Sequence, residues 1–272
     1  MNTGTNNKRE YQFTQKEPDN IVTLDISSVK NLQIGYQAET IFLKAGEDDN
    51  LVIKEYINGL SGTEFYAKVA SNRFKTTIRH GRREEVNTRT FVEVFLPRSW
   101  HGELKLSSSY GCISTEDNWT FDQVDIQANE GSVLLRTIEA PRIRINTATS
   151  PVYIEKAVGF IDIHTVSGLI RADSISGGAK LATSGAPIFA SFETLNNIIE
   201  TTTLNGATNL TLPKSCGIKV DGVSKRGKIS CEIEGLEVRV KPGNVTVVTG
   251  ILGEKPYQNV RLSSINGDIN LL

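Results

Sequence analysis

The 272-residue sequence lacks an uninterrupted apolar run of about 18 residues, the length that a membrane-spanning helix requires. Its opening, MNTGTNNKREYQFTQKEPDN, also lacks the apolar stretch of a secretory signal peptide. We therefore expect residues 1–20 to form a disordered tail and the chain, as given, to be cytoplasmic without a direct membrane span. Envelope association through a leader or anchor is the alternative.

An excess of charge of one sign is lacking too. Lys and Arg total 30 and Asp and Glu total 31, for a net charge of -1, which argues against a nucleic-acid partner. The three cysteines, Cys112, Cys216 and Cys231, are odd in number and have no CxxC spacing. A disulfide framework and a zinc site are therefore disfavoured, and we expect free thiols.

Motifs of known catalytic chemistry are absent as well. The sequence has no GxSxG, HExxH or P-loop pattern, and no GGxGxD calcium repeat. We expect no catalytic residue, no cofactor and no metal site.

What the sequence does contain is a recurring phrase. VDIQANEGSV at 124–133 is echoed by IDIHTVSGLI at 161–170, each with a charged residue between apolar ones ahead of a Gly or Ser turn. This charged position recurs at intervals of 18 to 20 residues, at Lys105, Asp125, Arg144, Asp162, Lys180 and Glu200. Lys219, Arg239 and Arg261 are expected to continue the column at intervals of 19, 20 and 22 residues. A fixed period near 20 indicates a repeat architecture.

Other positions keep the same register. Three residues past each charge are small residues expected at a buried corner: Ser108, Ala128, Thr147, Thr165, Thr183 and Thr203. Six residues past are small residues suited to a sharp turn: Gly111, Gly131, Ser150, Gly168, Ala186 and Gly206. Each coil should thus hold two short strands joined by a corner.

One such coil cannot bury its apolar side alone, so successive coils must stack. The sequence predicts an all-β fold, a right-handed parallel β-solenoid, over residues 98–272. Residues 21–97 follow a looser strand pattern and are expected to form a β-rich region that caps the solenoid, with one continuous domain over 21–272 as the alternative. An antiparallel sandwich is disfavoured because its turns would recur every 8 to 12 residues.

Charges alternate in sign along the column from Lys105 to Glu200. Asp125 and Asp162 could serve as a catalytic carboxylate pair, but a ladder of exposed ion pairs is favoured because each carboxylate has cations on both sides. A basic cluster of Arg79, Arg82, Arg83 and Arg89 could bind an anion; Glu84 and Glu85 within it favour an exposed loop.

The second strand of each coil carries apolar residues where polar ones would be expected. The outward positions include Leu134, Tyr153, Leu169, Arg171 and Phe189. We expect Tyr153, Arg171 and Phe189 to stack in a cation–π contact and to form a partner- or glycan-binding face. The alternative is that the N-terminal region, loops or a second copy of the chain cover this face.

The run FVEVFLPRSWHGELKLSSSYGCI, the repeated LxLxxxxGxI phrases and LTLPKSCGIKV resemble the bacterial putative-adhesin family of β-strand-repeat proteins, a group of undetermined function. The resemblance spans roughly residues 20–272 and implies a solenoid-like β domain of cell-envelope or adhesin-like type. The favoured hypothesis is a non-enzymatic binding or scaffolding module with a protein or glycan partner and a capacity for self-association. The alternative is a polysaccharide-active lyase or hydrolase, which would need a groove with a carboxylate perturbed by another carboxylate.

Overall fold

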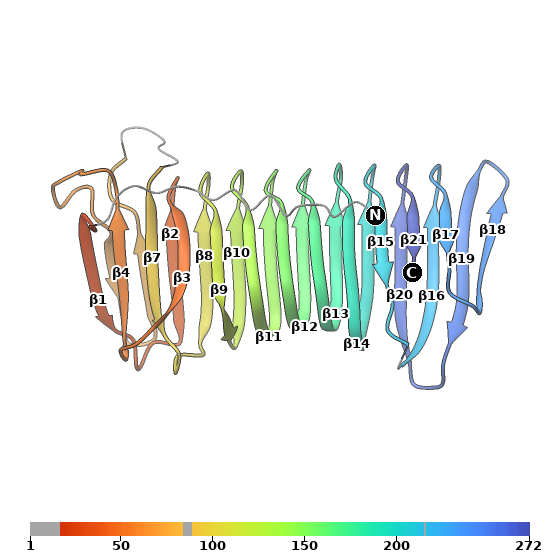
Figure 1. Cartoon of the computed structure of the whole chain (residues 1–272), viewed down its shortest axis with the longest axis horizontal. Coiled ribbons are helices and arrows are strands. Elements are labelled where there is room, and N and C mark those ends of the chain that lie inside the picture. Colours follow the sequence, from red (N-terminus) through yellow and green to blue (C-terminus); the bar gives the residue numbers. More distant parts are fainter. Residues whose placement is uncertain (1–16, 84–88, 215) are drawn as a thin grey trace, which may run out of the picture.

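The computed structural model describes residues 17–83, 89–214 and 216–272. Within these ranges the protein is all-β, with 21 strands and no helix. The strands lie side by side along one long axis and form a β-solenoid with two walls (Figure 1). The four long strands in the middle, β11 to β14, each bend, so that the amino-terminal half lies in one wall and the carboxyl-terminal half lies in the other.

The first wall contains the following strands, in the order of their hydrogen-bonded neighbours. They are β5 (Lys68–Ser71), β6 (Lys75–Arg79), β2 (Asn31–Tyr36), β8 (Glu103–Ser108), β10 (Gln123–Ala128), the carboxyl-terminal halves of β11 (Val133–Thr147), β12 (Val152–Thr165), β13 (Ile170–Thr183) and β14 (Ile188–Thr203), and then β20 (Tyr257–Ser264), β16 (Gly217–Ser224), β19 (Val245–Leu252) and β18 (Leu236–Lys241).

The second wall is built in the same way from the other strand of each coil. It contains β1 (Asn20–Asp25), β4 (Asn50–Tyr56), β7 (Phe91–Pro97), β3 (Thr40–Gly46), β9 (Ile113–Thr120), the amino-terminal halves of β11 to β14, and then β15 (Thr208–Thr211), β21 (Ile269–Leu271) and β17 (Ile229–Cys231).

The charge column predicted from the sequence is confirmed from its first member to its sixth. Each of Lys105, Asp125, Arg144, Asp162, Lys180 and Glu200 lies opposite the next on a parallel neighbouring strand. Beyond Glu200 the sequence-based continuation is wrong, because the next neighbour is Arg261 and the one after it is Asp221. Lys219 instead lies opposite Asn259, and Arg239 lies on β18 opposite Val247.

This difference arises because the last coil of the chain is not last in space. β20 and β21 insert between the coil of β14 and β15 and the coil of β16 and β17. The N-terminal end has the matching arrangement, since β2 and β3 lie between the coil of β6 and β7 and the coil of β8 and β9 (Figure 1). Antiparallel strands then close both ends, with β1, β4 and β5 at one and β18 and β19 at the other.

The core lies between the walls and runs through the whole solenoid as one cluster of buried apolar side chains, from Ile26 to Leu271. The corner column is buried, as predicted: Ser108, Ala128, Thr147, Thr165, Thr183 and Thr203. At Ser108, Thr165 and Thr183 the hydroxyl oxygen accepts the turn amide three residues later; for example, the amide of Gly168 donates to Oγ1 of Thr165 over 2.8 Å. The hydroxyl of Thr147 instead donates to the carbonyl of Ser150, and that of Thr203 bonds to the hydroxyl of Ser264. A buried corner therefore tolerates Ser and Thr because the turn satisfies their oxygens.

Glycine in the turns is explained by the approach of one coil to the next. A Cβ on Gly206 would lie 1.7 Å from the carbonyl oxygen of Ala186, and one on Gly267 would lie 1.9 Å from that of Gly206. Neither glycine has a positive φ among the backbone angles of the described residues, so close packing, not a left-handed conformation, selects glycine.

Three expectations stay predictions. They are the right-handed sense of the coil, the boundary between a 21–97 cap and a 98–272 solenoid, and the disordered tail. Of residues 1–20, the first sixteen lie outside the described residues, whereas Oδ2 of Asp19 accepts the amide of Ile57 over 2.6 Å. The three cysteines are free thiols, as expected.

Candidate binding face

A row of large side chains crosses the outside of the second wall. Leu134, Tyr153, Arg171 and Phe189 lie opposite one another on β11, β12, β13 and β14. The alternation of each strand places them outside because their sequence neighbours point into the core. Leu134 is 38% exposed, Tyr153 37% and Phe189 41%. Leu169, two residues before Arg171, is half-buried. We call these five residues the apolar face.

Arg171 does not behave as the cation–π prediction required. Its Nε donates to Oδ1 of Asp173 over 2.7 Å, and both side chains are about half exposed, at 53%. Among the described residues, cation–π contacts lie at Lys44, Lys54 and Arg73 instead. The binding role of the apolar face stays a prediction.

The second wall also carries an aromatic and basic cluster that the sequence reading missed. Nζ of Lys44 lies 5.9 Å from the ring centroid of Phe42 and 5.8 Å from that of Phe95, and Nζ of Lys54 lies 4.8 Å from Phe95. The cluster adjoins the apolar face, because Phe42 neighbours Ser114 and Ser114 neighbours Leu134. The alternation in TIFLKA and FVEVFLP is the signal that could have revealed it, once β3 was paired with β7.

Glu93 holds the centre of this cluster. It forms an ion pair with Lys44 at 2.5 Å and accepts the hydroxyl of Tyr56 at 2.9 Å. Burial, the hydrogen bond to Glu93 and its negative charge together raise the pKa of Tyr56 to about 12. One ion pair and one hydrogen bond at Glu93 therefore join β3, β4 and β7.

The charge column offers no catalytic carboxylate pair, since Asp125 and Asp162 are separated by the strand of Arg144. Asp162 is surrounded by cationic and imidazole groups: Arg142 at 3.3 Å, Arg144 at 3.8 Å and Nε2 of His164 at 2.9 Å. Farther along, Glu200 pairs with Lys180 at 3.9 Å and with Arg261 at 3.3 Å. Asp162 and Glu200 therefore form ion pairs, but Asp162 is 9% exposed and Oδ1 of Asp125 is buried without a hydrogen-bond partner among the described residues. The column is not the continuous ladder of exposed ion pairs that the sequence favoured.

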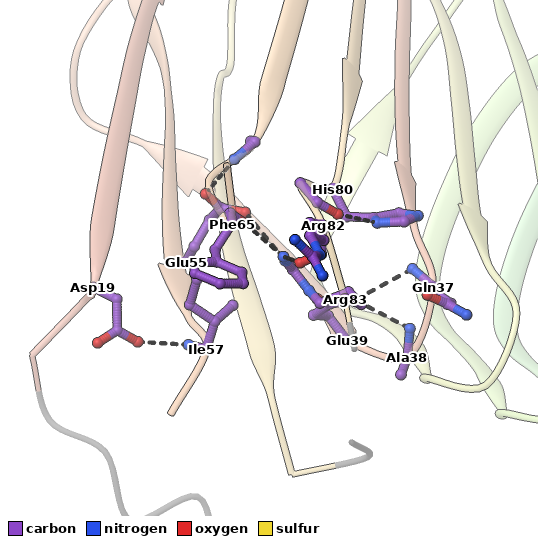
Figure 2. A network of polar contacts seen from close by, with 12 residues as sticks. Asp19, Gln37, Ala38, Glu39, Glu55, Ile57, Phe65, His80, Arg82 and Arg83 are labelled. Carbon is purple, nitrogen blue, oxygen red and sulfur yellow. Dashed lines mark hydrogen bonds and ion pairs between the residues drawn. The ribbon is translucent and has the colours of Figure 1, made fainter. Parts of the chain in front are cut away.

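The basic cluster at 79–89 is not the exposed loop that the sequence favoured, at least at Arg83. This guanidinium turns inward, its side chain only 8% exposed, and its Nε pairs with Oε1 of Glu39 at 2.5 Å (Figure 2). Its Nη2 lies 3.8 Å from Oε1 of Glu55, another buried carboxylate. Glu84 and Glu85, on which the expectation of exposure rested, lie outside the described residues.

This buried network ties the N-terminal segments to one another. Oε2 of Glu39 accepts the amides of Gln37 and Ala38, and Oε2 of Glu55 accepts the amide of Ala67 and the side chain of Asn20. Burial and the charges of Glu55 and Glu39 raise the pKa of Tyr36 well above its ordinary value. The network lies beneath the surface and holds the end of the solenoid together, so we do not assign it a ligand.

A polysaccharide hydrolase site would need a groove with two neighbouring carboxyl groups. A hollow beside β16 and β20 is lined by Lys214, Cys216, Glu254, Lys255 and Gln258 among others, and Glu254 is the one carboxylate among the described residues of this lining. Near the second wall, the nearby hydroxyl of Ser174 and the charge of Lys156 lower the pKa of Glu193, which is the opposite of what a general acid requires. Among the described residues no cluster of three or more His, Cys, Asp or Glu could hold a metal ion.

Comparison with known proteins gives a family and a fold. The sequence model of the family described as Toastrack DUF4097 matches residues 29–272. A "putative adhesin" from Bacteroides fragilis shares the fold with a TM-score of 0.52 at 12% identity, over 95% of this chain and 100% of that one. A "putative adhesin" from Parabacteroides distasonis has a TM-score of 0.51 at 14% identity, over 93% and 96%.

The comparison with curated proteins finds no match to the chain. In the part of the chain that the structure describes, there is no helix with the length and apolar character to cross a membrane.

Proposed function

The chain belongs to the Toastrack DUF4097 family, and we propose that it is a non-enzymatic, adhesin-like binding module whose apolar face takes a glycan. The observation that carries the proposal is the row of exposed side chains Leu134, Tyr153 and Phe189 on one wall, in which Arg171 lies between Tyr153 and Phe189. Exposed apolar patches of this kind mark interaction sites. The adhesin names of the two structures with the same fold support the class of function and a setting at the cell envelope.

The arrangement of the face favours a glycan over a second protein surface. Tyr153 and Phe189 are separated by the single strand β13, so their rings lie about two strand spacings, or ~9.6 Å, apart along the wall. Between them, Arg171 and Asp173 present a charged donor and acceptor pair. Sugar rings have a C–H face that packs on aromatic rings and hydroxyl edges that bond to such charged groups.

The parallel pairing of the middle coils spaces the side chains of this face regularly. A right-handed coil is part of the proposal because nearly all parallel crossovers have that hand. A long glycan could then follow the stacked strands across several coils. The aromatic and basic cluster of Phe42, Lys44 and Phe95 would extend the same track.

The test is a glycan-array screen of the wild-type chain, followed by titration of the best ligand into the double variant Tyr153→Ser, Phe189→Ser. We expect affinity to fall at least tenfold while the melting temperature stays close to that of the wild type, since both side chains are exposed. Val166→Ser, at a turn residue that is 60% exposed, is the matched control and should bind like the wild type.

Three results would overturn the proposal. Binding that survives the double change would place the site elsewhere, and a wild-type chain that binds no glycan but captures a protein would assign the face to a protein partner. Release of shortened products from a bound polysaccharide would show an enzyme instead.

A further inference from the structure

The C-terminal end of the first wall leaves one strand uncovered. β18 pairs with β19 along one edge, and no strand pairing along its other edge is found among the described residues. The first wall extends past β16 by both β19 and β18, whereas the second wall ends at β17. Figure 1 shows this pair at the far blue end of the molecule.

The uncovered strand carries apolar side chains on its core-facing side. Val238 lies opposite Val248, which is fully buried, so both side chains point to the interior side of the wall. Yet Val238 is 38% exposed and Val240, two residues further, is 73% exposed. Natural proteins usually protect such an edge by charge, bulges or covering segments, because its free N–H and C=O groups can pair with another strand.

We propose that β18 pairs in antiparallel fashion with β18 of a second copy of this chain, about a two-fold axis at Val238. In this register Leu236 lies opposite Val240 of the second copy, and Val238 lies opposite its counterpart. Apolar side chains thus meet on one side of the joined sheet. Because the same edge of both chains is used up in this two-fold pairing, assembly stops at a dimer, as in most homodimers.

Charge complementarity selects this register. Glu237 lies opposite Arg239 of the second copy, and Arg239 lies opposite its Glu237, so both cross-strand pairs join opposite charges. The two residues already pair within one chain, Nε to Oε1 and Nη2 to Oε2 at 2.5 Å each. A register centred on Arg239 would place two guanidinium groups face to face.

The ends of the strand fit the same register. Gly235 has a φ of +90°, which ends the extended backbone before Leu236. Pro242 follows Lys241 and lacks the N–H that a longer ladder would need. The pairing is thereby confined to the segment centred on Val238.

Sedimentation equilibrium of the full chain tests the proposal. The wild type should dimerise, and Glu237→Arg and Arg239→Glu should each weaken dimerisation at least tenfold, because each places like charges opposite one another. The double swap Glu237→Arg, Arg239→Glu should restore it. Val240→Lys should also dissociate the dimer, and at concentrations where the wild type is monomeric the two melting temperatures should agree, because this side chain is 73% exposed in the single chain.

The decisive measurement mixes the two single variants and identifies the species by native mass spectrometry. One variant has two cations at these positions and the other has two anions, so the mixture should form a heterodimer that neither forms alone. Each single variant loses its own internal Glu237–Arg239 pair and mixing cannot repair that loss, so the heterodimer reports the contact between chains.

Three outcomes would overturn the inference. They are a monomeric wild type, single variants that dimerise as well as the wild type, and open-ended oligomers, which would indicate head-to-tail pairing of β18 with an N-terminal edge such as β5. The glycan-binding variants leave β18 unchanged, so failure of the proposed function and failure of this dimer would be seen separately.

Discussion

Nη1 of Arg261 lies 3.3 Å from Oε1 of Glu200, although 61 residues separate them in the sequence. The contact exists because β20 inserts beside β14, and it restores the alternation of charge that the sequence order breaks. From Lys105 onward the column reads plus and minus in turn through Arg261 to Asp221. Alternation therefore belongs to the spatial order of the coils.

Reversing the charge at Arg261 should loosen the inserted coil. Arg261→Glu would place three carboxylates on adjacent strands and lower the free energy of unfolding by about 1 kcal/mol, since exposed pairs are individually weak. Urea denaturation at low salt measures the change. Lys219→Glu is the control, because Lys219 lies opposite Asn259 and outside the column; an equal loss in both variants would contradict the role given to the column.

A charge at the buried corner should be far more costly. Thr165 is 7% exposed, and replacing it with Lys buries an unpaired ammonium group, which should cost about 3 kcal/mol or more. Thermal unfolding is the measurement. Val166→Lys, one residue later at a 60% exposed position, should leave the melting temperature nearly unchanged. An unchanged melting temperature for Thr165→Lys would refute the burial of the corner.

The close approach of the turns predicts a difference between two glycines. Gly206→Ala would put a Cβ 1.7 Å from the carbonyl oxygen of Ala186, and the backbone shift should cost about 2 kcal/mol or more. At Gly185 the nearest atom to a new Cβ lies at 3.5 Å, so Gly185→Ala should be tolerated. Chemical denaturation of both variants decides, and equal stability would mean that the coils are farther apart.

Removing Arg83 should leave two buried carboxylates without their cation. Arg83→Met keeps much of the side-chain length and should destabilise the chain by about 3–5 kcal/mol, because Glu39 and Glu55 stay buried. Arg79→Met, at an exposed position of the same segment, is the control. Differential scanning calorimetry compares the two, and similar traces would show that the network is not structural.

Tyr56 should make the protein sensitive to alkali. Its folded pKa is about 12 and the usual value is near 10, so between these pH values the unfolded state ionises first and the free energy of unfolding falls as pH rises. The contribution of neutral Tyr56 to the free energy of unfolding is fully present below about pH 10 and is lost as the pH rises toward 12. Tyr56→Phe removes the contribution of this residue, and urea titrations at pH 8 and pH 11 should show a smaller fall than in the wild type; an equal fall would exclude Tyr56 as its source.

Much of the candidate face followed from the sequence. In the middle coils each strand pairs with the coil that precedes or follows it in the sequence. A repeat period near 20 residues therefore predicts directly that Leu134, Tyr153 and Phe189 lie at the same register position. The partner of Arg171 did not follow, because Asp173 lies on the same strand and competes with the rings for the guanidinium. Local alternation places a side chain on a face but does not choose among its neighbours.

The sequence by itself determined the all-β fold, the spacing of the coils from 104 to 210, the buried corner and the exposed row. Only the tertiary structure decided the order of the coils at the two ends and the inward turn of Arg83. Every coil presents nearly the same small corner and the same charged column, so a repeat pattern cannot tell which coil stacks on which. The order of the coils and the position of Arg83 depend on contacts between segments distant in the chain, such as Arg261 with Glu200 and Arg83 with Glu39. These contacts form only in the complete folded solenoid.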